Sequence, residues 1–565
     1  MTELLIVIVV ALIVIASATL LGPRFGVASP LVLVAIGVAA SLVPAFDSVQ
    51  IDPELILQGI LPPLLYSAAV SLPTMNFRRE FGAIGGLSVA LVVGTALILG
   101  VFFMLVIPGL GFAWGVALGA IVSPTDAVAA SIIKKTPVSK RVVAMLDGES
   151  LLNDATALAL LRAAIVATAA TFSFWGAVGS FSYSVLIALV IGGAVGWLNL
   201  VVRKRITDPT VNTAISFTVP FIASVPAELL GASGLVAAVV AGIVTGIRAP
   251  RLFSPQNRLS DTQNWRMIEL VLEGAIFLMM GLQISAILTD VENDDAGIRN
   301  AVLIAAGALV ITVVVRAAYV APLLAFLARR AKRHESMKSR MQVVQERLNA
   351  PKDIQDAAER GSKHNPARSE RYLQRVTGLV TRSLADIEYF RREPLGWREG
   401  TTVVWAGMRG AITVAAAQTL PSDTPQRSTL ILIAFAVAAM SLLVQGGTIG
   451  TVVRRISPKV DKVAVAERER EERTRLFALL KASASTIPPR LDVNGAVVDS
   501  DNAYAPLDAD FDDEKRHRLA VIDAQRTALL DARDNGIFDA DLLENALANL
   551  DASQIALEMR GKPTA

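Results

Sequence analysis

Three carboxylates fall in or beside the stretch GESLLNDATALALL, which otherwise reads as a membrane helix. An ionised carboxylate is costly to bury in hydrocarbon unless it is paired or hydrated, so residues of this kind are candidates for a functional site. Ser150 and Asp154 are one helical turn apart, as are Glu149 and Asn153, which places two polar stripes side by side on one helix. We expect Asp147 to lie near the membrane surface and Asp154 deeper, because a long apolar stretch follows Asp154.

The stretch GAIVSPTDAVAASII predicts a second polar position at membrane depth. Pro124 removes a backbone N–H group and disfavours the helical conformation at Ser123. A helix break at this depth is tolerated only where the backbone faces protein or a water-filled cavity. The freed carbonyl groups and the Asp126 carboxylate would together make an oxygen-rich site suited to a hard monovalent cation. The alternative is a simple proline kink with Asp126 close to the membrane surface.

A lone arginine, Arg316, lies in the apolar run AVLIAAGALVITVVVRAAYVAPLLAFLA. It is too far from the nearer end of the run for its side chain to reach the surface easily. A buried guanidinium requires a carboxylate partner, and the chain offers Glu149, Asp126, Asp154 and Glu273. We expect the pair Arg316–Glu149. If that pair is purely structural, it still brings the two helices together.

A second arginine lies in the stretch TTVVWAGMRGAITVAAA, where Gly407 and Gly410 bracket Arg409. Two interrupted helices with opposite charges at their breaks are typical of transporters built from inverted repeats, in which half-helix ends meet at mid-membrane. Asp126 would then compensate the positive helix ends and Arg409 the negative ends. The alternative is a kinked helix with Arg409 near the cytoplasmic face.

The elements that position these residues follow from composition. The chain has 565 residues, of which 53% are hydrophobic and 18% charged. Its apolar runs are each about 18 to 30 residues long, enough to cross a bilayer, so we predict an all-α polytopic membrane protein. The first run lacks the basic segment of a signal peptide and is expected to be a retained helix. About thirteen spans are predicted, at about 3–22, 27–45, 54–72, 81–108, 112–133, 142–170, 174–202, 211–227, 231–247, 266–288, 299–328, 401–419 and 428–453.

The loops between these spans alternate between basic and either short or acidic. The positive-inside rule then places the N-terminus outside and the C-terminus in the cytoplasm. We predict a transmembrane domain over residues 1–455, interrupted by a cytoplasmic insertion at 329–398 between spans 11 and 12. Residues 456–565 would form a cytoplasmic helical tail, in which apolar spacing and an Asp-Asn-Gly break predict a small amphipathic hairpin. This tail is a candidate for packing or regulation, with a regulatory partner or ligand.

Composition also excludes several classes of function. The net charge is +3, but the basic residues cluster in short loops, which membrane topology explains better than nucleic-acid binding. The chain has no cysteine, which excludes disulfides and thiolate metal sites. It has no Gly-rich phosphate loop, HExxH or GxSxG motif, so we expect no enzyme and no cofactor. The polar residues converge on one helix break instead of lining a pore, which favours a secondary transporter over a cation channel.

Several stretches resemble bacterial sodium/proton exchangers of the monovalent cation:proton antiporter superfamily. They are IVSPTDAVA, GESLLNDATALAL, the lone Arg316, WAGMRGAITVA and ILPPLLYSAAV, and the resemblance covers about residues 1–455. It implies that Asp154 alternately holds a proton and Na⁺. It also implies that Asp126 lies where the broken helices cross and that the Thr125 main-chain carbonyl is a ligand. Glu149 and Ser150 would complete the coordination of the cation held by Asp126 and Asp154.

The resemblance carries further expectations. Asn153 matches the Asn-Asp form of the motif, which is associated with electroneutral exchange, while Arg316 and Arg409 are supporting residues. A homodimer in the plasma membrane is implied, exchanging Na⁺ and H⁺ for pH and sodium homeostasis. Two departures, Ser67 where many relatives have Glu and Ala127 where some have Pro, leave the choice among Na⁺, Li⁺ and K⁺ open. A K⁺/H⁺ antiporter is therefore the nearest alternative.

Overall fold

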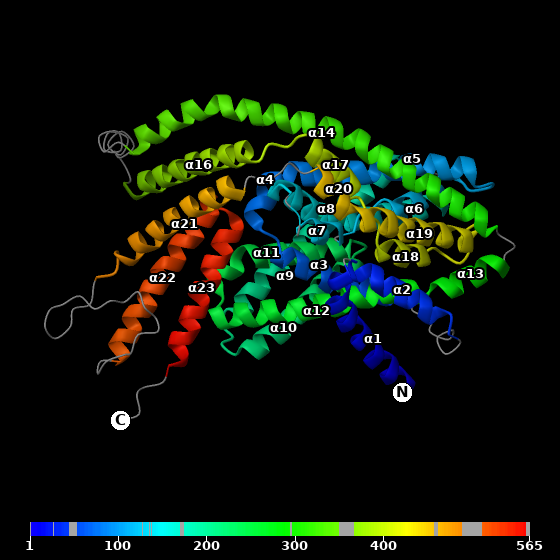
Figure 1. Cartoon of the computed structure of the whole chain (residues 1–565), viewed down its shortest axis with the longest axis horizontal. Coiled ribbons are helices and arrows are strands. Elements are labelled where there is room, and N and C mark those ends of the chain that lie inside the picture. Colours follow the sequence, from blue (N-terminus) through cyan, green and yellow to red (C-terminus); the bar gives the residue numbers. More distant parts are fainter. Residues whose placement is uncertain are drawn as a thin grey trace. The chain divides into compact units, whose positions relative to one another are not determined.

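The computed structural model describes residues 2–25, 27–43, 53–126, 128–134, 136, 138–169, 174–293, 297–349, 366–456, 462–488 and 511–560. The described residues form helices joined by turns and contain no β-strand, in agreement with the predicted all-α class. The helices are labelled in Figure 1. The chain divides into two compact units, the first comprising residues 1–252, 260–324 and 395–458 and the second residues 253–259, 325–394 and 459–565.

Within the described residues, eight helices are long and apolar enough to cross a membrane. They are Thr74–Val106, Lys140–Thr168, Gly179–Arg203, Pro209–Leu229, Gly234–Leu252, Pro255–Val291, Ile298–Arg333 and Arg427–Ile456. Shorter apolar helices cover Leu5–Leu21, Ser29–Ser41, Leu55–Ser71 and Phe112–Val122. The protein is thus a multi-span membrane protein, and the count of thirteen spans stays a prediction.

The N-terminal part of the first unit is a succession of closely packed helices. Its elements are α1 (Thr2–Leu21), η1 (Gly22–Phe25), α2 (Ser29–Ser41), η3 (Leu55–Ile60), α3 (Leu61–Ser71), α4 (Thr74–Gly85), η4 (Gly86–Leu91), α5 (Val92–Val106), α6 (Phe112–Val122), α7 (Val128–Ile133), α8 (Lys140–Ala169), α9 (Phe174–Arg203), α10 (Pro209–Leu229) and α11 (Gly234–Leu252). Glycines set the approach of α5 and α6, since a Cβ on Gly115 would lie 2.5 Å from the Gly100 carbonyl oxygen. Such small residues let membrane helices approach closely, which here places the end of α6 in the interior.

The rest of the chain adds the second broken helix and the polar parts. Its elements are α12 (Pro255–Leu282), α13 (Ile284–Asn293), α14 (Ile298–Asn349), α16 (Pro366–Arg392), α17 (Trp397–Trp405), α18 (Ala411–Gln418), α19 (Arg427–Ser441), η5 (Leu442–Gly446), α20 (Gly447–Ile456), α21 (Lys462–Ala484), α22 (Phe511–Asn535) and α23 (Ala540–Met559). The helices are interrupted between α6 and α7 and between α17 and α18. These are the two stretches in which the sequence predicts breaks.

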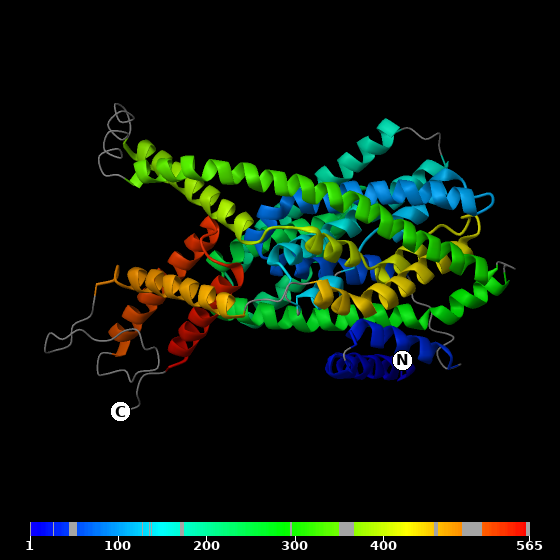
Figure 2. The same cartoon turned by 45° about the horizontal axis from the view of Figure 1, so that its top comes forward.

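The tail forms a small helical core of its own. The hairpin expected there consists of α22 and α23, which turn at Gly536 with a φ of +69° in the Asp-Asn-Gly stretch. Helix α21 joins the hairpin as a third helix that the sequence reading did not identify, and the three lie together in Figures 1 and 2. Their shared core consists of Leu476, Leu529, Ala532, Phe538 and Leu543. Residues 489–510, which include most of the Pro- and Asp-rich stretch STIPPRLDVNGAVVDSDNAYAPLD, lie outside the described residues.

The polar insertion begins inside a helix and not after one. Helix α14 continues without interruption from the apolar span to Asn349, and α16 runs beside its polar half (Figure 2). The side chains of Lys338 on α14 and Glu388 on α16 form an ion pair at 3.2 Å. The compact unit that contains this pair covers 325–394 and also includes the tail, whereas the sequence predicts an insertion at 329–398 and a separate tail.

The Glu388 carboxylate gives a pH-dependent prediction for this unit. A hydrogen bond from Arg391, with further ones from Lys338 and Arg392, lowers the pKa of Glu388 from 4.5 to about 2. Because the folded pKa is depressed, the stabilisation is complete above pH 4.5 and is lost as the pH falls through about 2. We expect Glu388→Gln to lower the free energy of opening of α16 at pH 7 by less than about 1 kcal/mol, because the ion pair is partly exposed. Hydrogen exchange of α16 measures this, and equal protection in both proteins at pH 7 would contradict it.

Candidate functional site

The two helix breaks meet in the structure through their backbones. The N–H group of Asp126, in the break between α6 and α7, donates to the carbonyl oxygen of Met408 at 2.7 Å. Met408 lies in the break between α17 and α18. Ser123, Thr125 and Met408 are buried, so the meeting point lies inside the protein. Helix breaks that are far apart in the sequence therefore share one location.

The two glycines that bracket Arg409 are required by close approach. A Cβ on Gly407 would lie 2.7 Å from Cδ of Arg316. A Cβ on Gly410 would overlap the carboxylate of Asp126. The second break therefore presses directly against Asp126 on one side and Arg316 on the other.

The Arg409 side chain binds the backbone of both breaks. Its Nε donates to the carbonyl oxygen of Val122 at 3.0 Å, and its guanidinium also reaches the carbonyls of Ser123 and Gly407. Arg409 is only 2% exposed, so these bonds form in a dry environment. Val122 ends α6, where the unpaired carbonyls carry the negative end of the helix dipole. The guanidinium thus supplies the positive charge that the sequence analysis expects at such an end.

The structure pairs Arg316 with Glu149, one of the four carboxylates considered from the sequence. The guanidinium contacts both carboxylate oxygens, with Nη2 to Oε2 at 2.7 Å. Its Nε also donates to the carbonyl oxygen of Val403 at 2.8 Å. Arg316 is 2% and Glu149 1% exposed, so the charges neutralise each other out of contact with water. The pair connects α8, α14 and α17.

Thr125 is held from two sides at the break. Its hydroxyl donates to Oε1 of Glu149 at 3.1 Å. The Asn153 amide donates to the Thr125 carbonyl oxygen at 3.0 Å and to its hydroxyl at 2.7 Å. Within the described residues, the amide oxygen of Asn153 is buried and has no hydrogen-bond partner. Asn153 therefore fixes the orientation of the carbonyl that is predicted to bind the cation.

Asp154 differs from Glu149 in having no such partner. It is 5% exposed, and in the described part of the chain it takes part in no hydrogen bond or ion pair. The nearby charge that acts on it is that of Asp126.

Ser150, on the same helix, donates its hydroxyl proton to the Asp147 carbonyl at 3.1 Å, and Asp147 pairs with Lys134 in the basic loop at 2.9 Å.

This arrangement can bind a small cation or a proton. Asp154 is a buried carboxylate without a countercharge, near a second carboxylate, which is unfavourable unless positive charge is added. Carbonyl, hydroxyl and carboxylate oxygens of the kind found here suit hard cations. Among the described residues, no group of three or more His, Cys, Asp or Glu side chains could hold a metal ion.

Two polar residues of the site were missed in the sequence analysis. Ser441 at the end of α19 accepts from the Arg409 backbone N–H at 2.9 Å and donates to Gln445 at 2.6 Å. Gln445 in turn donates to the Trp405 carbonyl at 3.3 Å, where α17 ends. Polar residues in an apolar span were a usable signal, since they satisfy backbone groups freed by a broken helix.

Ser67, where many relatives are expected to have Glu, lies next to a glutamate of another helix. Ser67 on α3 is buried and donates to the Glu269 carboxylate on α12 at 2.6 Å. Glu273, one turn further along α12, interacts electrostatically with Asp126. A carboxylate is therefore present at this position, supplied by α12 instead of α3. The other departure, Ala127, lies outside the described residues.

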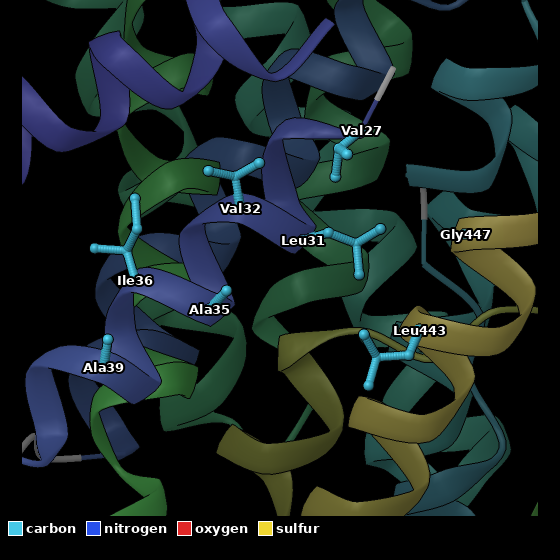
Figure 3. Close-up of a pocket in the computed structure, with 8 residues that line it drawn as sticks. All are labelled: Val27, Leu31, Val32, Ala35, Ile36, Ala39, Leu443 and Gly447. Carbon is cyan, nitrogen blue, oxygen red and sulfur yellow. The ribbon is translucent and has the colours of Figure 1, made fainter. Parts of the chain in front are cut away.

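An apolar groove of about 550 Å³ lies elsewhere in the first unit (Figure 3). It is lined by Val27, Leu31, Val32, Ala35, Ile36, Ala39, Leu443 and Gly447. The lining carries no charged side chain, so the groove is unsuited to binding an ion.

Membrane helices interrupted at a shared point, with buried carboxylates beside the breaks, define a secondary transporter. The chain belongs to the family of transmembrane sodium/hydrogen exchangers, whose family model matches residues 8–348 and 372–455. It is a bacterial monovalent cation:proton antiporter, and its family consists of transporters.

Individual relatives agree with this membership. The uncharacterized Na(+)/H(+) exchanger Rv2287 of Mycobacterium tuberculosis is 27% identical over 98% of this chain and 96% of that protein. The sodium, potassium, lithium and rubidium/H(+) antiporter of Bacillus subtilis is 30% identical over 52% of this chain and 45% of that protein. The solved sodium proton antiporter MjNhaP1 of Methanocaldococcus jannaschii aligns with a TM-score of 0.54 at 14% identity, over 80% of this chain and 99% of that one. This last likeness concerns the fold alone.

Gly410→Ala tests the contact between the second break and Asp126. The added Cβ overlaps the Asp126 carboxylate and must displace it. Overpacking of this kind costs about 1–3 kcal/mol, so we expect the half-saturating cation concentration for exchange to rise about tenfold or more. Gly94→Ala is the matched control, because a Cβ there would meet nothing within 4 Å. Equal cation dependence in the two variants would contradict the expected role of the contact.

Proposed function

We propose that this protein exchanges Na⁺ for H⁺ across the plasma membrane, one for one, in sodium and pH homeostasis. The observation that carries the proposal is the contrast between two buried carboxylates on α8. Glu149 is neutralised by Arg316, whereas Asp154 has no partner among the described residues. A proton and a cation each supply the missing positive charge, and one carboxylate cannot hold both.

In this mechanism, Asp154, Asp126, the Thr125 carbonyl and Ser150 bind the cation, and Glu149 helps to orient them. Protonation of Asp154 expels the cation, and cation binding expels the proton. Asn153 holds the Thr125 carbonyl in place, while Glu149 remains paired with Arg316. The carrier changes the side to which the site opens only when Asp154 is occupied, which couples the two fluxes.

The membrane arrangement belongs to the same proposal. Residues 1–455 form thirteen spans with inverted repeats, the N-terminus lies outside, and the tail at 456–565 and the insertion at 329–398 lie in the cytoplasm. The active form is a homodimer. The alternating basic loops support the orientation. Cysteine scanning with a membrane-impermeant label tests it without interference, because the chain has no native cysteine.

Proton movement in proteoliposomes tests the function. With an imposed pH gradient, addition of Na⁺ is expected to dissipate the gradient, as measured by dequenching of a pH-sensitive dye, and Li⁺ and K⁺ are compared at each pH. A response to K⁺ larger than that to Na⁺ would favour a K⁺/H⁺ antiporter. The Bacillus subtilis relative, whose name includes potassium, makes this comparison necessary. Current without a proton gradient would indicate a channel instead.

Asn153→Asp tests the stoichiometry. The substitution adds a titratable carboxylate beside the Thr125 carbonyl and next to Asp154 in sequence. We expect wild-type exchange to be independent of membrane potential and that of the variant to depend on it. Potential is set with K⁺ and valinomycin, and Asn199→Asp, a buried amide on α9, is the control. If neither form responds to potential, Asn153 does not determine the stoichiometry.

A further inference from the structure

The first turn of α12 belongs to the same compact unit as the tail, residues 253–259. There Arg258 contacts both oxygens of Asp551 on α23, with its Nε at 3.0 Å from Oδ2. Arg526 on α22 binds the same carboxylate at 3.0 Å and donates to Gln554 at 2.6 Å. One carboxylate of the tail is thus held between an arginine of its own hairpin and an arginine of α12.

A second contact lies at the end of α23. Gln256 of α12 donates to the Glu558 carboxylate, which also accepts from Gln554 at 2.7 Å. Lys515 on α22 donates to the carbonyl oxygens of Glu558 and Arg560 at 3.1 and 3.2 Å. These bonds fix the last turn of α23 against α22. The tail therefore presents Asp551 and Glu558, two turns apart on one helix face, to Arg258 and Gln256.

The same unit holds two further segments that continue into the span helices. The polar half of α14 pairs with α16 through Lys338 and Glu388, and Arg382 of α16 donates to Asn535 of α22 at 3.2 Å. Helix α14 carries Arg316 in its apolar half, and α16 leads directly into α17 and the break at Arg409. Helix α12 carries Glu269 and Glu273. Three segments that carry polar residues of the site thus have their polar ends in one unit with the tail.

We propose that the α22–α23 hairpin is an intramolecular regulator that binds the first turn of α12 and restrains this helix during transport. The contact consists of an ion pair and a hydrogen bond between partly buried side chains. Contacts of this kind contribute more to the specificity of binding than to its affinity. Such a contact suits reversible binding. Because α12 is continuous from Pro255 to Leu282, a restraint on its first turn acts on the segment that carries Glu273. Release of the hairpin increases turnover.

Charge reversal tests the functional part of this inference, which rests on the proposed exchange activity. Arg258→Asp and Asp551→Arg are each expected to raise the exchange rate in proteoliposomes at least twofold. The double variant restores opposite charges between positions 258 and 551 and is expected to bring the rate back toward that of the wild type, with Arg526 as the remaining like charge beside position 551. Glu544→Arg, an exposed position on α23, is the matched control for a reversed charge on the tail and is expected to leave the rate unchanged.

Crosslinking tests the contact independently of transport. The chain has no native cysteine, so Gln256→Cys with Glu558→Cys gives a defined pair in the full-length protein. A short bis-maleimide is expected to join the two positions and to slow exchange, relative to the same protein treated with N-ethylmaleimide. Gln256→Cys with Glu544→Cys is expected not to crosslink.

Two outcomes overturn the inference. One is the absence of the crosslink in the folded protein. The other is a crosslinked carrier, or a carrier with either single charge reversal, that turns over at the wild-type rate. A wild-type protein that shows no cation/proton exchange would contradict the proposed function instead, while the crosslink would still report on the contact.

Discussion

Asp154→Asn is expected to reduce Na⁺-driven proton movement in proteoliposomes to the level of empty vesicles. Asparagine preserves the size and shape of the side chain but carries no charge and releases no proton. The neutral amide at this buried position needs no countercharge. The substitution also breaks no hydrogen bond or ion pair among the described residues. The protein should therefore fold normally and lose function, which separates a transport role from a structural one.

The measurement is dye dequenching on Na⁺ addition, with thermal unfolding in detergent as the test of folding. Asp147→Asn is the matched control on the same helix, because the charge of Asp147 is compensated by Lys134 of the basic loop, whereas that of Asp154 is not. We expect that variant to keep exchange within about twofold of wild type, since a partly exposed ion pair contributes about 0–1 kcal/mol. Undiminished exchange by Asp154→Asn would refute the assignment of Asp154.

Arg316→Ala is expected to destabilise the protein strongly, by about 3–5 kcal/mol, as is usual when one member of a buried ion pair is removed. The substitution leaves the Glu149 carboxylate at 1% exposure without its countercharge and frees the Val403 carbonyl. Glu149→Ala in the same chain removes the uncompensated charge. The double variant should therefore be more stable than Arg316→Ala alone.

Thermal or denaturant unfolding of the four proteins in a double-mutant cycle gives the coupling free energy. Single-variant effects that simply add would show that the two residues are not partners. The exposed pair Arg162–Glu228, at 3.0 Å, provides a control cycle, for which we expect less than about 1 kcal/mol. The comparison separates the effect of burial from that of ion pairing.

Much of the site was predictable from the sequence because burying charge in a membrane is so unfavourable. Few charged residues occur in the apolar runs, so Asp126, Glu149, Asp154, Arg316 and Arg409 stand out without any structure. Pro124 and the glycines around Arg409 predict the two breaks for backbone reasons alone. The structure places these breaks against each other and pairs Arg316 with Glu149.

Other parts of the site depend on neighbours that are distant in the sequence. Ser441 and Gln445 become relevant only because α19 and η5 lie against the second break. The Glu269 carboxylate reaches Ser67 across 202 positions of the chain. No local pattern encodes such contacts, since propensity and hydropathy describe each helix separately.

The sequence alone determined the class of protein, its all-helical membrane character and the residues able to carry charge into the membrane. It determined them because hydropathy and the free energy of burying charge are properties of individual segments. Only the tertiary structure decided which carboxylate pairs with Arg316 and which has no partner among the described residues. It also decided that the insertion, the tail and the first turn of α12 form one unit. Pairing depends on distances between helices, and these are fixed by packing.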